Sequence, residues 1–257
     1  MKIFVCVKQV PDTETKIKIA ADNISIDTSS VKWIMNPYDE YAVEEAIKQR
    51  DANPGAQVWL VTSGPKKRAS EVLITGLAMG CDEGIIIDSP ENLDPLTTAK
   101  ALAQVIKAEG GADLIFTGKL AIDDNAASVG QMVAELLAIP HTTVVSKLTN
   151  KPESVICERE VEGGACEIVQ MQKPALIGAN KGLNKPRYAS LPGIMKAKKK
   201  VLKIVEFASL GISSAAKIKT LSLELPPDKP PVKLMSGELS QQISNLVTAL
   251  RDEAKVL

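Results

Sequence analysis

The sequence has few of the side chains that enzymes use for acid–base or covalent catalysis. It contains one histidine, His141, with no nucleophile or acid pair beside it. A surface or core role therefore suits His141 better than that of a catalytic base. The four cysteines show neither paired metal-ligand spacing nor the density of a disulfide scaffold: Cys6, Cys81, Cys157 and Cys166. We expect reduced thiols, no metal site and a protein that is not an enzyme.

Long apolar runs are also missing. No run reaches the roughly 18 residues that indicate a membrane span. The residues Met1–Lys8 read as a strand, with no secretory or Arg-rich transit pattern before them. With 257 residues, 45% of them hydrophobic, the chain can bury one sizeable core, or a core plus an appendage. We therefore expect a soluble, cytoplasmic protein.

Acidic residues are absent from Ile168 to Val205, although the whole chain has 31 acidic and 31 basic residues. Nine of the basic residues lie in this stretch, so the remainder has 22 basic against 31 acidic residues, a net charge of −9. The rest of the protein therefore has a net negative charge, and this stretch has a net positive charge.

Residues 183–200, at the centre of this stretch, are called the basic segment here. Two prolines and a glycine interrupt the basic segment, so we do not expect a continuous helix through residues 191–193. The expected structure is a loop that presents three apolar side chains among cations, as an anchor for an acidic partner: Leu191, Ile194 and Met195. A solvated basic linker is the alternative interpretation.

Strand-like and helix-like runs alternate through the first 140 residues. The expected strands are residues 3–7, 57–62, 83–88 and 113–117, with a small hairpin over 16–26. Asn36 and Pro37 predict the start of a helix that runs to about Asp51, with Asp39 in its first turn. Strand–helix alternation at this spacing implies parallel pairing through right-handed crossovers. The predicted fold is α/β, a Rossmann-like parallel sheet with helices on both faces.

The alternation weakens after Pro140. Residues 142–145, 154–161 and 166–171 read as strands with polar turns, and residues 175–178 as a return to the main sheet. Residues 226–231 are proline-rich and predict an extended arm, followed by an amphipathic helix over Glu238–Lys255. We therefore divide the chain into an α/β domain, residues 1–200, and a C-terminal arm and helix, residues 201–257, that needs a partner subunit to pack on.

Open parallel sheets bind ligands beyond the carboxyl ends of their strands. The longest such segment, residues 117–131, contains small residues that lead into a helix, and a helix N-terminus can bind phosphate. An ordinary strand-to-helix turn is the alternative, since neither a Walker A motif nor a G-x-G-x-x-G fingerprint is present. For Asp123 and Asp124 we favour capping of this helix over a metal site.

Several stretches together closely resemble the electron transfer flavoprotein beta subunit family: residues 7–12, 35–39, 78–80, 118–124, 158–164 and, above all, 183–200. The resemblance implies an adenine-nucleotide-binding domain that binds AMP in a structural role, while a larger alpha subunit holds most of the FAD. The implied cofactor-binding residues are Cys6, Asn36, Pro37, Tyr38, Asp39, Ser63, Gly118, Lys119, Leu120, Ala121, Ile122, Asp123, Asp124, Asn125, Ala126, Ala127, Ser128 and Val129. Thr13 and Tyr38 match positions that approach the flavin.

The resemblance also implies partners. The chain would form a heterodimer with the alpha subunit, take electrons from acyl-CoA and related dehydrogenases in fatty acid oxidation, and pass them to a membrane-bound quinone oxidoreductase. The basic segment resembles the loop that recognises these dehydrogenases, with the implied contacts Leu183, Arg187, Tyr188, Leu191, Pro192, Ile194, Met195, Lys196 and Lys199. Nucleic-acid binding is disfavoured because only one aromatic residue lies in the basic segment.

Two further hypotheses stay open. One is a bifurcating relative in which a second FAD replaces AMP. Members of that branch carry Thr-Ala-Gln-Val-Gly-Pro where this chain has residues 126–131, Ala-Ala-Ser-Val-Gly-Gln, so the resemblance favours AMP. The other is a stand-alone adenine-nucleotide-binding regulatory module, which the arm and terminal helix disfavour.

Overall fold

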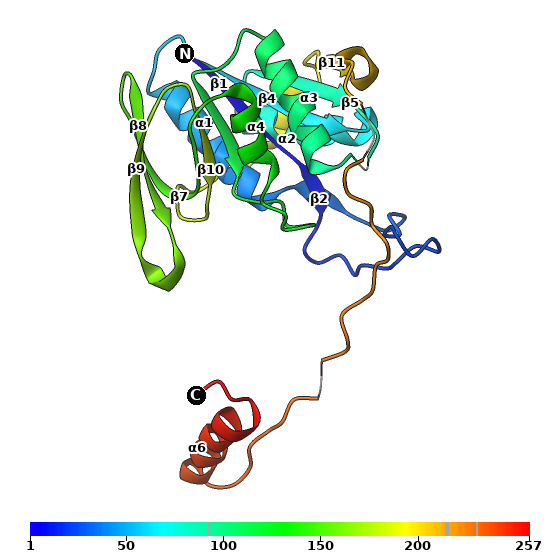
Figure 1. Cartoon of the computed structure of the whole chain (residues 1–257), viewed down its shortest axis with the longest axis vertical. Coiled ribbons are helices and arrows are strands. Elements are labelled where there is room, and N and C mark those ends of the chain that lie inside the picture. The colour runs from blue at the N-terminus through cyan, green and yellow to red at the C-terminus, as the bar shows by residue number, and fades with distance from the viewer. Residues whose placement is uncertain (92, 214–215, 230) are drawn as a thin grey trace.

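A mostly parallel sheet forms the centre of the molecule (Figure 1). This computed structural model describes residues 1–91, 93–213, 216–229 and 231–257, and within them nine strands make one sheet. In spatial order they are β11 (Lys203–Glu206), β5 (Glu83–Asp88), β4 (Gln57–Gly64), β1 (Lys2–Cys6), β6 (Leu114–Gly118), β10 (Ala175–Ala179), β7 (His141–Asn150), β8 (Ser154–Glu160) and β9 (Cys166–Gln172). Neighbours are parallel from β11 to β7, and β7, β8 and β9 are antiparallel. The predicted α/β fold with a parallel sheet is confirmed.

Helices cover both faces of the sheet because its central strands are apolar on both sides. Alternate residues of a strand point to opposite faces. In β1, Ile3 and Val5 pack in a core with α1 (Pro37–Asp51) and α2 (Lys66–Met79). Phe4 and Cys6 pack in a second core with α3 (Pro95–Ala108) and α4 (Val129–Leu137). The two-sided arrangement agrees with the prediction.

The second half of the chain returns to the sheet as expected. Strand β10 lies between β6 and β7, so residues 175–179 join the parallel part. The antiparallel strands β7, β8 and β9 extend from the sheet, with the short 3₁₀ helix η1 (Glu162–Gly164) between β8 and β9 (Figure 1). This extension confirms the strands predicted after Pro140.

The region between β1 and α1 differs from the prediction. The expected hairpin over residues 16–26 is reduced to an isolated bridge between Ile19 and Ile26. A two-stranded antiparallel sheet forms instead between β2 (Gln9–Pro11) and β3 (Trp33–Met35). These two strands are three residues long, too short for an alternating pattern to reveal them.

The basic segment contains a short helix, which corrects the loop expected at its apolar positions. Helix α5 (Leu191–Ala197) begins at Leu191 and includes Pro192 and Gly193. Proline is tolerated there because the first turn of a helix needs no backbone N–H donor. The Ser190 hydroxyl caps α5 by accepting a hydrogen bond from the Gly193 N–H at 3.1 Å. The prolines therefore start a helix in this segment rather than prevent one.

The C-terminal part leaves the sheet after β11 and the short 3₁₀ helix η2 (Phe207–Leu210). Residues 216–229 and 231–237 run as an extended arm, and Pro230 of the predicted proline-rich stretch lies outside the described residues. Helix α6 (Leu239–Thr248) and the π-helical turn η3 (Ala249–Glu253) follow, and Figure 1 shows α6 far from the sheet. The predicted amphipathic helix is confirmed.

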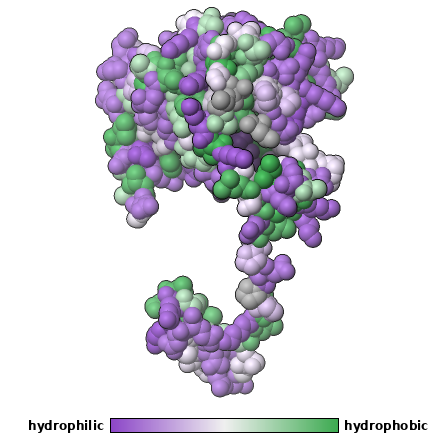
Figure 2. All heavy atoms as spheres, turned by 45° about the vertical axis from the view of Figure 1, so that its right-hand side comes forward, coloured by the Kyte–Doolittle hydropathy of each residue, from purple (hydrophilic) through white to green (hydrophobic). Residues whose placement is uncertain are grey.

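The apolar side chains of α6 are exposed. Leu239, Ile243 and Leu246 all lie in contact with solvent, and Figure 2 shows hydrophobic residues on this detached part of the chain. No helix in the described ranges combines the length and the apolarity needed to cross a bilayer. The arm and α6 therefore carry an apolar face that the rest of the chain leaves uncovered.

We predict that Ile86→Ala strongly destabilises the chain. Ile86 is fully buried in β5, so the truncation leaves a cavity and should lower the free energy of unfolding by about 2–5 kcal/mol. Ile168→Ala, on the outer strand β9 at 73% exposure, is the control and should change it by less than about 0.5 kcal/mol. Urea unfolding followed by circular dichroism measures both. Equal effects of the two substitutions would contradict the assignment of the core.

Candidate functional site

The predicted cofactor-binding residues meet at the carboxyl edge of the sheet. Strand β1 lies between β4 and β6 and runs parallel to both. Cys6, Ser63 and Gly118, at or near the ends of these three strands, are therefore brought to the same edge. Residues 36–39 join them, because they form the start of α1 beside β6. The structure thus assembles segments that are far apart in sequence.

Asn36 holds the loop that follows β6. It occupies the predicted N-cap position of α1, but its side chain makes no cap hydrogen bond. The buried amide instead donates to the Leu120 carbonyl at 2.8 Å and to Asp39 Oδ1 at 2.9 Å, and it accepts from the Ile122 N–H at 3.2 Å. Asn36 therefore fastens residues 120–122 to the start of α1.

Asp39 forms the centre of this polar cluster. Its carboxylate accepts hydrogen bonds from the Lys8 N–H at 2.7 Å, the Gly118 N–H at 3.0 Å and the Asn36 side chain. The first-turn position predicted for Asp39 is confirmed, and the structure buries this residue. Burial raises the pKa of Asp39 to about 7, and the three hydrogen bonds oppose this rise. The carboxylate joins the ends of β1 and β6 to α1.

Position 118, at the end of β6, requires glycine. A Cβ atom at this position would clash with Asp39 Oδ1 and would lie 2.7 Å from Tyr38 Cβ, closer than real Cβ contacts come. The missing side chain lets the chain pass directly over the start of α1. The loop after β6 therefore begins in contact with Asn36, Tyr38 and Asp39.

The two acids of the loop bind a lysine instead of capping a helix. Helix α4 begins only at Val129, so the predicted capping role of Asp123 and Asp124 is wrong. Lys8 Nζ lies 2.8 Å from the Asp123 carboxylate and 3.2 Å from that of Asp124. Within the described ranges no group of three or more metal-ligating side chains occurs. The acid pair ties the loop to the end of β1.

The end of the loop has the features of an anion site. Ser128 is the N-cap of α4, and its Oγ is buried without a hydrogen-bond partner among the described residues. Asn125 and Ala127 have positive φ angles of 53° and 47°, which turn the backbone sharply before the helix. The first N–H groups of α4 have no intrahelical acceptor. The end of the loop therefore combines an unpaired hydroxyl with the N-terminus of a helix.

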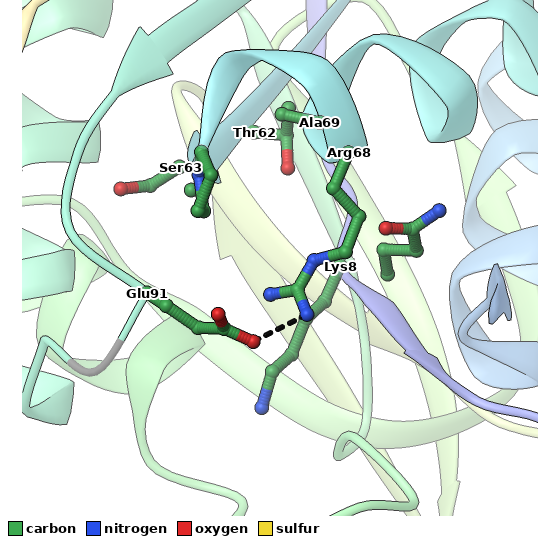
Figure 3. A pocket seen from close by; sticks show the side chains of 9 residues that line it. Lys8, Thr62, Ser63, Arg68, Ala69 and Glu91 are labelled. Atoms are coloured by element: carbon green, nitrogen blue, oxygen red, sulfur yellow. Dashed lines mark hydrogen bonds and ion pairs between the residues drawn. The ribbon is translucent and has the colours of Figure 1, made fainter. Parts of the chain in front are cut away.

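A small pocket adjoins this loop on the β4 side. It has a volume of about 60 Å³ and is lined by Lys8, Gln9, Thr62, Ser63, Gly64, Pro65, Arg68, Ala69 and Glu91. Figure 3 shows Arg68 and Glu91 reaching toward one another, and they form an ion pair. The Arg68 guanidinium also lies 3.9 Å from the centre of the Trp33 ring. Lys8 lies between this pocket and the loop after β6.

Arg68 and Glu91 were missed from the sequence. Their positions after strand ends could have indicated them. Arg68 follows the Ser63–Pro65 segment by three residues, and Glu91 follows the end of β5. Neither residue belongs to a motif, so they can be assigned to the site only from their positions in the folded chain.

Cys6 and Ser63 both lie at the carboxyl edge of the sheet. Burial raises the pKa of the Cys6 thiol to about 12, and the charge of Asp39 adds to this rise. Ser63 Oγ lies 2.9 Å from Ser89 Oγ, within hydrogen-bond distance. Tyr38, half-buried, has Lys119 Nζ 4.8 Å above the centre of its ring. The arrangement is suited to binding rather than to nucleophilic chemistry.

Comparisons with known proteins show the family of the chain. A family model described as "Electron transfer flavoprotein domain" matches residues 23–210. The chain is 41% identical to "Electron transfer flavoprotein subunit beta" of Bacillus subtilis (strain 168), over 100% of both chains. Proteins of the same name from Dictyostelium discoideum and Mus musculus are 39% and 37% identical, each over 100% of this chain and 99% of theirs. The chain belongs to the electron transfer flavoprotein beta subunit family.

The family predicted from the sequence is thus confirmed, and membership implies a heterodimer with an alpha subunit. The basic segment of this beta subunit has an exposed and a buried side. Tyr188, Leu191 and Met195 are exposed by 95%, 72% and 60%, and Pro192, Lys196 and Lys199 are also exposed. Leu183 is buried in the core and Ile194 is half-buried. Arg187 lies against α1, where it binds Glu44.

We predict that Asn36→Ala loosens the loop after β6. The substitution leaves the partly buried Leu120 carbonyl and Ile122 N–H without the Asn36 side chain as partner, which should lower the free energy of unfolding by about 1–3 kcal/mol. Hydrogen exchange of the Ile122 amide should also become faster. Asn245→Ala, on the exposed α6, is the control and should change neither quantity measurably. An unchanged Ile122 exchange rate would contradict the role of Asn36.

Proposed function

We propose that this chain is the beta subunit of a heterodimeric electron transfer flavoprotein that binds AMP. The heterodimer would accept electrons from acyl-CoA and related dehydrogenases, as part of fatty acid oxidation, and pass them to a membrane-bound quinone oxidoreductase. The observation that carries the proposal is the similarity to proteins named electron transfer flavoprotein subunit beta, at 36–41% identity over the whole chain. The subunit would bind and dock, and would contribute no acid–base or nucleophilic catalysis.

Features of the carboxyl edge of the sheet support the proposal of AMP binding. Phosphate would bind the N-terminus of α4, where Ser128 has an unpaired hydroxyl and the first N–H groups of the helix lack intrahelical acceptors. The adenosine would lie along the edge lined by Cys6, Ser63 and residues 118–127. Asn36 and Asp39 already use their polar atoms on the protein, so they would shape the loop rather than bind the nucleotide.

The exposed parts of the chain support an alpha subunit and a docking partner. The apolar face of α6 would pack on the alpha subunit, which would hold most of the FAD. The FAD supplies the electron transfer when bound, and Thr13 and Tyr38 of this chain would approach its ring. The exposed Leu191 would insert into an apolar pocket of a dehydrogenase, while the surrounding lysines steer the encounter.

The cofactor content of the heterodimer tests the proposal directly. We expect the chain, co-expressed with its alpha subunit and denatured after purification, to release one FAD and one AMP per heterodimer, measured by chromatography. Two FAD and no AMP would contradict the AMP assignment and favour the bifurcating branch. A stable nucleotide-binding monomer that forms no complex would contradict the electron-carrier assignment.

We further predict that Ser128→Asp removes AMP without unfolding the chain. Aspartate is a good N-cap, so α4 should keep its stability, but its negative charge would repel a phosphate at the same point. The AMP released per heterodimer should fall by about tenfold or more, which corresponds to a loss of at least ~1.4 kcal/mol. Ser128→Asn, a neutral N-cap, is the control and should retain most AMP. Full AMP retention by Ser128→Asp would contradict phosphate binding at α4.

A further inference from the structure

The basic segment is fastened to α1 by one buried carboxylate. Glu44 is only 8% exposed at its side chain and accepts three hydrogen bonds from Arg187. Arg187 Nε lies 2.8 Å from Oε2 and a terminal guanidinium nitrogen 3.0 Å from Oε1, a bidentate pair. The backbone N–H of Arg187 also donates to Oε2 at 3.1 Å. Glu44 thus holds both the side chain and the backbone of the segment.

The neighbouring acid strengthens this attachment. Glu45, also buried, accepts a hydrogen bond from the Asn184 side chain at 3.1 Å, and the Tyr41 carbonyl accepts another at 3.0 Å. Two residues of the segment, Asn184 and Arg187, are therefore joined to the middle of α1. An isolated buried carboxylate would be costly, so Glu44 at this position requires its cationic partner.

The other end of the basic segment is fastened to the turn between α2 and β5. Lys200 Nζ donates hydrogen bonds to the backbone carbonyls of Cys81, at 3.4 Å, and Asp82. Ala197 is buried, and α5 lies so close to α2 that a Cβ at Gly193 would come 2.8 Å from the Ala78 carbonyl oxygen. The segment is thus a bridge held at both ends on a rigid domain.

The exposed residues of the bridge lie between its two attachments. Tyr188, Leu191 and Met195 project into solvent, and the exposed lysines of the segment surround them: Lys185, Lys196, Lys198 and Lys199. Arg187 and Lys200 differ from these cations, because their charged groups bind the protein itself. Two positive charges of the segment therefore attach it to the protein, and the other four are exposed to solvent.

We propose that Glu44 is a positioning residue for partner docking: through Arg187 it holds the basic segment in the conformation that presents Tyr188, Leu191 and Met195 to a dehydrogenase. This inference rests on the proposed function. A surface that is already ordered loses less conformational entropy on binding, so it binds more tightly for the same contacts. Without the Glu44 attachment, residues 184–190 would have to be ordered at each encounter. Because Glu44 is buried, it would act through Arg187 and not by direct contact with the partner.

The test uses the intact heterodimer with Glu44→Gln, which keeps the size of the side chain but loses its charge and one acceptor. Glu40→Gln is the matched control, one turn earlier on α1, where no hydrogen bond or ion pair to the basic segment occurs among the described residues. Hydrogen exchange of the Arg187 amide reports on the attachment itself. Reduction of the heterodimer by an acyl-CoA dehydrogenase that reduces the wild type reports on docking.

We expect Glu44→Gln to speed exchange at Arg187 by about tenfold or more, since a charged hydrogen-bonded pair is lost. The KM of the dehydrogenase for the heterodimer should rise by several-fold, with kcat and AMP content unchanged. Arg187→Gln should raise the KM similarly, and the double variant should raise it no further, because Glu44 acts through Arg187. Glu40→Gln should leave both measurements at wild-type values.

Two results would overturn the inference. Unchanged Arg187 exchange in Glu44→Gln would show that the attachment does not hold the segment. Faster exchange with an unchanged KM would show that the attachment serves the fold and not docking. If no acyl-CoA dehydrogenase reduces the wild-type heterodimer, the proposed function fails instead, and the exchange measurement alone still decides whether Glu44 holds the segment.

Discussion

The buried cluster of Asn36, Asp39 and the Gly118 N–H is the constraint on which the rest of the site depends. It joins the end of β1, through the Lys8 N–H, to the end of β6 and to the start of α1. Buried polar groups of this kind are costly unless every partner is in place, so the cluster permits few other arrangements. The path of the loop after β6, and with it the position of α4, follows from this cluster.

Helix α1 connects the two functional regions of the chain. Its first turn holds the loop proposed to bind AMP through Asn36 and Asp39, and its middle holds the basic segment through Glu44 and Glu45. All four residues are buried, so α1 uses polar side chains where a typical core helix would use apolar ones. The apolar residues between them, such as Val43 and Ile47, fix α1 on the sheet. Helix α1 therefore holds both regions in place relative to the sheet.

The sequence predicted the elements more completely than their side-chain contacts. Hydrophobic periodicity located the main strands, and Asn36 and Pro37 located the start of α1, because these signals are local. The contact between Glu44 and Arg187 spans 143 residues, and no local pattern encodes it. Asp123 and Asp124 resembled caps because the sequence alone cannot show that Lys8 comes within reach. Proline at 192 resembled a helix breaker because its effect depends on where the helix starts.

The apolar face of α6 and the exposed Leu191 of the basic segment differ in how they are attached to the domain. The apolar face of helix α6 is uncovered and lies beyond an extended arm, which is joined to the domain where the Leu223 N–H donates to the Asn23 carbonyl at 2.8 Å. Leu191 instead lies on a segment fastened at both ends. A permanent subunit interface is large and apolar, so its partner can order an arm once, at assembly. A carrier that exchanges partners needs a small contact with rapid release, and it must avoid an ordering cost at every encounter. Under the proposed function, the uncovered helix α6 suits the alpha subunit, and the fastened segment suits the dehydrogenases.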